Sequence, residues 1–261
     1  MARAGVGAEW SDYRWRVPLV AAAVCPHPPL VVPEVAAGAA GELDDLRAAC
    51  DAALTRVFAE EPDVVVLLGS GSATREYRSP YRASFHRWGA DVEFRLGDAG
   101  SGAPPLPLSL AVGVWLVRRA VDAGRVRRSP AWYAHTVAAD ATPTECAAMG
   151  ARLRSTDDWA LLVLGDGSAC RGEKAPGYDD ARAEPFDKTV AQALATADAG
   201  ALLALDPALA AELGAAGRAP WQVLAGAGAG AIGRSEVLYE AAPYGVAYIV
   251  ATWTRAASPR S

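Results

Sequence analysis

A short apolar run that ends in prolines constrains the fold of this chain more than any other stretch. Leu19–Val24 contains only apolar residues. It is far too short to cross a membrane, so it predicts a strand buried on both faces of an α/β sheet. Three of the four residues after Cys25 are prolines, which have no amide hydrogen to donate. Neither a strand nor a helix can therefore continue beyond this point.

His27 lies between these prolines. The proline rings fix the φ angles of its neighbours, so the imidazole is presented rigidly at the carboxyl edge of the predicted sheet. Ligands of open α/β sheets bind at this edge. The sequence leaves two interpretations open, a functional histidine and a histidine that only satisfies a loop hydrogen bond.

Two further apolar runs end in loops that carry polar side chains. Asp63–Leu68 runs into Gly69-Ser70-Gly71-Ser72, and Trp159–Leu164 runs into Gly165–Arg171. The carboxyl ends of parallel strands meet at one edge of a sheet. We therefore expect both loops to lie at the same edge as His27.

The rest of the chain alternates between helical and strand periodicity, which predicts an α/β fold with a single-domain, mixed, mostly parallel sheet flanked by helices. We expect this domain over residues 17–254, a loose N-terminal leader over 1–16 and a C-terminal tail over 255–261. Arg75–Ala90 is expected to form a loop over the sheet edge. The other predicted strands are Val92–Leu96, Ala131–Val137, Val237–Glu240 and Gly245–Trp253, and the predicted helices are Glu42–Glu60, Ser109–Asp122, Thr142–Leu153, Pro185–Ala197, a short one capped by Asp206, and Pro220–Ala231.

Composition narrows the class of protein. Hydrophobic residues make up 52% of the chain, which is enough for a well-packed core. The formal net charge of −5 argues against nucleic acid as a partner, because phosphate contacts need a basic face. No apolar stretch approaches the roughly 20 residues of a membrane span. The four cysteines lack the spacing of a metal or redox motif, and we expect a cytoplasmic protein that does not bind membranes.

Three short segments, in this order, carry a resemblance to a known family. They are Cys25-Pro26-His27-Pro28-Pro29-Leu30, Gly165-Asp166-Gly167-Ser168 and Ala242-Pro243-Tyr244-Gly245-Val246-Ala247-Tyr248, with Ala175-Pro176-Gly177-Tyr178 and Phe186-Asp187 between the last two. Together they resemble the class III extradiol ring-cleavage dioxygenases, the LigB-like superfamily that includes the Memo proteins. The resemblance covers residues 18 to 253 and implies a LigB-like fold.

The same resemblance implies an Fe(II) site built from two histidines and a carboxylate, with a further histidine as acid/base. His27 matches the first metal histidine. The second histidine position reads Gly69-Ser70, and the acid/base position reads Ala169-Cys170. The remaining family positions fall at Ala111-Val112 and at Gly217-Arg218, with Glu212 close to the latter.

A single imidazole cannot retain Fe(II), since affinity depends on several ligands held in geometry. We therefore expect that the Fe(II) of the family is not retained and that the chain is not a working ring-cleavage enzyme.

Three functions remain as hypotheses. The first is a small polar ligand in the cleft of the family, bound by Ser70, Ser72, Asp166, Ser168, Arg171 and Tyr244. The second is a remodelled metal-dependent oxidoreductase, in which His27 combines with Cys170 or Cys25 and with Asp166 or Glu212; a variant uses Cys170 as a nucleophile and His27 as its base. The third is a structural role, as a homo-oligomer or as the partner subunit of a complex, with Tyr77–Trp88 as the interface.

Overall fold

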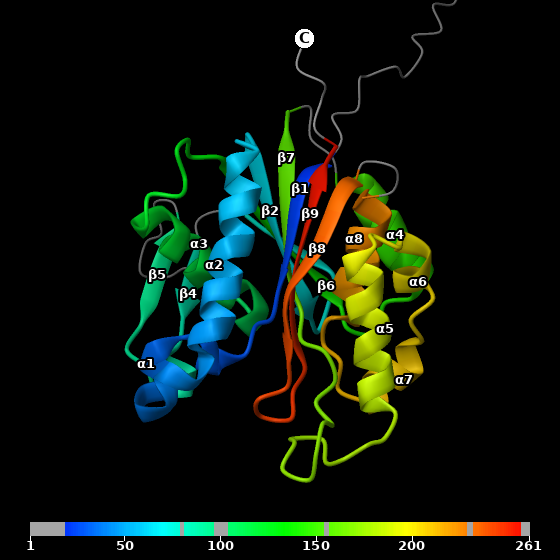
Figure 1. Ribbon diagram of the computed structural model, residues 1–261. Coiled ribbons are helices and arrows are strands. Elements are labelled where there is room, and N and C mark those ends of the chain that lie inside the picture. The colour runs from blue at the N-terminus through cyan, green and yellow to red at the C-terminus, as the bar shows by residue number, and fades with distance from the viewer. Residues whose placement is uncertain (1–18, 79–80, 97–103, 154–156, 229–231, 257–261) are drawn as a thin grey trace, which may run out of the picture.

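A seven-stranded sheet lies between two layers of helices in the computed structural model, which describes residues 19–78, 81–96, 104–153, 157–228 and 232–256 (Figure 1). The strands are β1 (Leu19–Cys25), β2 (Val64–Gly71), β3 (Arg75–Tyr77), β6 (Ala131–Ala138), β7 (Trp159–Leu164), β8 (Ile232–Ala241) and β9 (Tyr248–Arg255), in the order β3-β6-β2-β7-β1-β9-β8. The four central strands β6, β2, β7 and β1 are parallel, and β3, β9 and β8 are antiparallel to their neighbours. The predicted fold class, a mixed and mostly parallel α/β domain, is confirmed.

Helices cover both faces of this sheet. Figure 1 shows α1 (Pro33–Ala36), α2 (Asp44–Ala59) and α3 (Leu108–Asp122) on one side, with the hairpin of β4 (Tyr81–Ser84) and β5 (Glu93–Leu96) outside them. The other side carries α4 (Pro143–Arg152), α5 (Ala183–Ala195), α6 (Ala199–Leu203), α7 (Pro207–Glu212) and α8 (Arg218–Gly228). Short 3-10 helices form at Pro29–Val31 (η1), Ala37–Leu43 (η2) and His86–Trp88 (η3). In the part of the chain that the structure describes, no helix has the length and apolar character needed to cross a membrane.

The central strands contribute to two hydrophobic cores at once. Along β2, Val65 and Leu67 face the core under α2 and α3, whereas Val66 and Leu68 face the core under α4 and α8. The apolar run of β7 alternates in the same way, and so does that of β1 from Ala21 onward. Such strands read as continuous apolar runs because both of their faces are buried. This is why three of the strands were predictable from the sequence.

The stretch Arg75–Ala90 differs from its prediction as a loop. It contains β3, which pairs with β6, then β4, which pairs with β5, and then η3. The loop prediction is wrong because both strands are short and are held by antiparallel pairing with distant segments, which leaves no apolar run in the sequence.

Two predicted helix starts, at Thr142 and at Asp206, are confirmed, whereas α5 and α8 each begin two residues before the predicted Pro185 and Pro220. Thr142 and Glu145 form a capping box at the start of α4, and the Asp206 carboxylate accepts a hydrogen bond from the amide of Ala208 at the start of α7. The expected leader over 1–16 lies outside the described residues, as do residues 257–261 of the expected tail; Arg255 belongs to β9.

Two glycines allow close packing of α4 against α8. A Cβ atom at Gly150 would overlap the carbonyl oxygen of Val223 and lie 2.7 Å from the amide nitrogen of Ala227, and a Cβ atom at Gly226 would overlap Ala147 in the same way. The helices can therefore only approach this closely without side chains at these two positions.

We predict that Gly150→Ala lowers the free energy of unfolding by about 1–3 kcal/mol, because the added methyl group forces two backbones apart. Urea denaturation measures this effect. Gly38→Ala is the control, since nothing lies within 4 Å of a Cβ atom at Gly38. Equal stabilities of the two variants would contradict this account of the helix contact.

His135 on β6 makes the stability of the fold depend on pH. Burial lowers the pKa of this histidine, and the charge of Glu76 opposes that shift only in part. The folded state therefore binds the proton less readily than the unfolded chain. The stability that neutral His135 contributes is fully present above its unfolded pKa of about 6.5 and is lost as the pH falls below that value.

We predict that the melting temperature falls between about pH 7.5 and about pH 5.5, and that it falls less in His135→Gln, which has no proton to bind there. Thermal denaturation monitored by circular dichroism measures both slopes. Parallel slopes would show that His135 does not carry the effect.

Candidate functional site

The three segments that carry the family resemblance meet at the carboxyl edge of the sheet. The amide of Gly165 donates to the carbonyl oxygen of Cys25 at 3.0 Å. The amide of Gly167 donates to the carbonyl oxygen of Ala247 at 2.8 Å, and the amide of Ala247 donates to that of Ser168 at 2.8 Å. The prediction that the loop after β7 lies at the same edge as the loop after β1 is confirmed.

His27 and Asp166 form the centre of this edge. Asp166 Oδ1 accepts a hydrogen bond of 2.7 Å from the backbone amide of His27 and lies 3.7 Å from its Nδ1 atom. The residue is only 8% exposed, and Nδ1 has no hydrogen-bond partner among the described residues. Tyr248 is buried nearby, and its pKa is raised first by burial and then by the charge of Asp166. The edge thus places the imidazole of His27 beside the carboxylate of Asp166, with the neutral phenol of Tyr248 close enough to feel that charge.

Ser168 and Arg171 belong to a separate cluster around Asp187 of α5. The amide of Ser168 donates to Oδ1 of Asp187 at 2.8 Å, and its hydroxyl donates to Oδ2 at 2.5 Å. Arg171 Nη1 pairs with the same Oδ2 at 3.2 Å. Ser168 and Asp187 are fully buried, so these contacts fasten the loop after β7 to α5 rather than present free groups to a ligand.

Cys170 is held as a thiol. Its Sγ donates to the carbonyl oxygens of Gly177 at 3.4 Å and of Leu213 at 3.5 Å. Burial raises the pKa of the thiol, with the charge of Asp180 adding to the shift. A nucleophilic cysteine needs a lowered pKa and a positive surrounding, so this geometry does not support Cys170 as a nucleophile.

The other predicted ligand-binding residues are placed apart from this centre. The carbonyl oxygen of Ser70 accepts a hydrogen bond of 3.0 Å from the Ser109 hydroxyl, and Ser72 is exposed after the end of β2. Tyr244 donates to Glu42 Oε2 at 2.8 Å, and this hydrogen bond raises the pKa of the phenol. No hydrogen bond or ion pair joins these side chains to His27 or Asp166 among the residues that the structure describes.

The donors around His27 do not fit the Fe(II) site that the family resemblance implies. In the described ranges, no three side chains of His, Cys, Asp or Glu gather closely enough to hold a metal ion. Ala111 and Val112 are core residues of α3. Glu212 pairs with Arg182 at 2.7 Å and is 58% exposed. The remodelled site from His27, cysteine and Glu212 is therefore not assembled in this structure.

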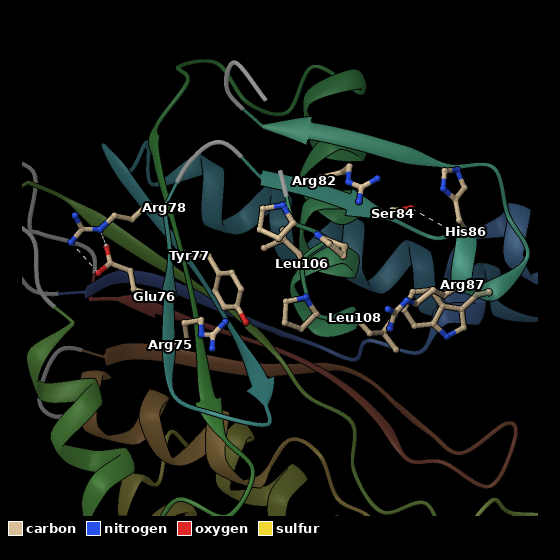
Figure 2. A pocket seen from close by; sticks show the side chains of 14 residues that line it. Arg75, Glu76, Tyr77, Arg78, Arg82, Ser84, His86, Arg87, Leu106 and Leu108 are labelled. Carbon is tan, nitrogen blue, oxygen red and sulfur yellow. Dashed lines mark hydrogen bonds and ion pairs between the residues drawn. The ribbon is translucent and has the colours of Figure 1, made fainter. Parts of the chain in front are cut away.

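A large cavity opens beside β3 and the start of α3. Its volume is about 890 Å³, within the range of small-molecule sites. Figure 2 shows three walls. Their residues are Arg75, Glu76, Tyr77 and Arg78 from β3 and just after it, Arg82, Ser84, His86, Arg87 and Trp88 from β4 and η3, and Pro104, Pro105, Leu106, Pro107 and Leu108 from the segment that leads into α3.

The cavity has a positive wall. Glu76 is the one carboxylate among its described lining residues, and it pairs with Arg78 at 3.2 Å. Figure 2 shows this pair turned outward, away from the other side chains. Arg82 is held by Glu93 at 3.1 Å. Arg75 and Arg87 have no ion-pair partner among the described residues, so two guanidinium groups are left for a ligand.

Backbone contacts explain why these three walls meet. The amide of Leu106 donates to the carbonyl oxygen of Arg82 at 2.9 Å, which ties the segment before α3 to β4. Phe85 is fully buried and lies 6.1 Å from the ring of Trp88, which anchors η3. The antiparallel pairing of β3 with β6 supplies the remaining wall.

Arg75 and Arg87 are not among the ligand-binding residues predicted from the sequence. The signal was present: Arg75–Trp88 contains four arginines and one acidic residue, interleaved with tyrosines and a tryptophan. That pattern is typical of anion-binding surfaces, whereas the hypothesis from the sequence for Tyr77–Trp88 was a protein interface.

Comparisons with known proteins leave the function open. No protein-family model matches this sequence, and no curated protein matches it. One solved structure that resembles the chain is an uncharacterized protein, JW3007, from Escherichia coli K12. It has 13% sequence identity and a TM-score of 0.46, and the match covers 90% of this chain and 99% of that one. This similarity is too low to carry an argument about function.

We predict that Asp187→Asn lowers the free energy of unfolding by about 3 kcal/mol, since an amide NH₂ in place of Oδ2 can accept a hydrogen bond from neither the Ser168 hydroxyl nor Arg171. Chemical denaturation measures the loss. Glu184→Gln on the same helix is the control. Its side chain is 53% exposed and pairs with Lys188, so we expect a change below about 0.5 kcal/mol.

Proposed function

We propose that this protein binds a small anionic molecule in the arginine-lined cavity beside β3. The observation that carries the proposal is the pair of guanidinium groups, Arg75 and Arg87, that share one concave surface without a carboxylate partner among the described residues. Guanidinium groups bind carboxylates and phosphates through charge-assisted hydrogen bonds. A cavity of this volume suits a small ligand.

The proposal modifies the first hypothesis from the sequence. The ligand is still proposed to bind at the carboxyl side of the sheet. The residues proposed to bind it are now Arg75 and Arg87 of the cavity, in place of Ser168 and Arg171. The Ser168 hydroxyl already donates to Asp187, and Arg171 is already paired with the same carboxylate. Two guanidinium groups without ion-pair partners bind an anion more favourably than a loop whose polar groups are already paired.

The relation to the extradiol dioxygenases is part of the same proposal. The order of the three motif segments and their meeting at one sheet edge support a divergent member of that family. The donor set around His27 supports loss of the iron-dependent reaction. The expectations of a cytoplasmic location, of no nucleic-acid partner, and of a homo-oligomer or partner subunit stay predictions from the sequence.

A panel of small anions tests the proposal: inorganic phosphate, benzoate, succinate and adipate at constant ionic strength. We expect at least one of them to raise the melting temperature and to bind in calorimetric titration. Arg75→Gln combined with Arg87→Gln should weaken that binding by about tenfold or more, the cost of losing charge-assisted hydrogen bonds.

Arg127→Gln combined with Arg234→Gln is the matched control. It removes the same net charge from two exposed positions outside the cavity and should leave binding unchanged. The proposal is wrong if no anion stabilises the wild-type protein, or if both double variants respond to the anions as the wild type does.

A further inference from the structure

We infer that the ligand of the arginine-lined cavity is a dianion with its two charged groups at opposite ends of an apolar body. The inference rests on the proposed function and specifies the class of ligand. It depends on how the charged and apolar groups are distributed along the cavity.

The two guanidinium groups without partners lie at different ends of the cavity. Figure 2 shows Arg75 beside Tyr77 at one end and Arg87 beside Leu108 at the other, with other lining side chains between them. Arg75 lies on β3 of the seven-stranded sheet. Arg87 lies in η3, which connects β4 and β5 of the two-stranded sheet. A single compact anion such as phosphate can pair with one of them at a time. Two separated charges on one molecule can pair with both.

One wall of the cavity is apolar. Residues 104–108 read Pro-Pro-Leu-Pro-Leu and line it, and Figure 2 shows Leu106 between Arg75 and Arg87. Prolines lack an amide hydrogen, so this wall offers few hydrogen-bond donors to the middle of a ligand. Tyr77 adds an aromatic ring beside Arg75, and Trp88, which follows Arg87 in the chain, adds a second to the lining. A hydrocarbon chain or an aromatic ring therefore matches the middle of the cavity, and a polyhydroxylated body does not.

The charges of the remaining groups favour the same class. Arg82 is held by Glu93, and Arg78 is held by Glu76. These pairs neutralise the cations between and outside the two ends. The field that remains is concentrated at Arg75 and Arg87, which selects for charge at the ends of the ligand rather than in its middle.

The test compares dicarboxylates with monocarboxylates of the same length. Succinate, adipate, suberate and terephthalate are titrated into the full-length protein by calorimetry, beside butyrate, hexanoate, octanoate and benzoate. We expect the best dicarboxylate to bind about tenfold more tightly than its monocarboxylate, because it gains a second charge-assisted contact. Arg75→Gln and Arg87→Gln should each reduce the affinity for that dicarboxylate to the level of the monocarboxylate.

The outcomes separate this inference from the proposed function. If monocarboxylates and dicarboxylates bind equally and the double arginine variant binds neither, the proposed anion site is supported and the inference of a dianionic ligand is wrong. If only one of the two single substitutions changes the affinity for the dicarboxylate, the ligand contacts one end and the inference is also wrong. If no carboxylate in the series and no phosphate binds, the proposed function fails and the inference fails with it.

Discussion

Burial of both faces of the central parallel strands is the constraint on which the rest of the structure depends. β1, β2 and β7 place alternate side chains into two separate cores, so helices must cover both sides of the sheet. The helices leave the carboxyl edge of the strands to loops. The abrupt stop after Cys25 and the glycines after β7 allow those loops to turn back over this edge, where His27 meets Asp166.

Two sites with different physical character result. His27 is buried and Asp166 is nearly so, and the neighbouring Ser168 and Arg171 are both paired with Asp187. Its polar groups mostly stabilise the loops that carry them. The cavity beside β3 has the opposite character, since it is concave and has cationic groups without partners among the described residues. Unused hydrogen-bonding capacity on a concave surface is what a ligand requires, which is why the proposed function is placed there.

The family resemblance implies an iron site at the edge where its three motif segments meet. The residues present do not fit such a site, because the positions that the resemblance implies for the other two iron ligands carry a glycine–serine pair and Gly217 with a buried arginine, Arg218.

The sequence by itself determined the three apolar strands, the helix caps and the edge at which His27 lies, because each of these follows from a local pattern of burial, proline or capping. Only the tertiary structure decided which polar groups are free. Asp187 lies 19 residues from Ser168 and takes up its hydrogen bonds, and no local pattern reveals that pairing. The cavity likewise forms where β3, η3 and residues 104–108 meet, through antiparallel pairing between segments that are distant along the chain.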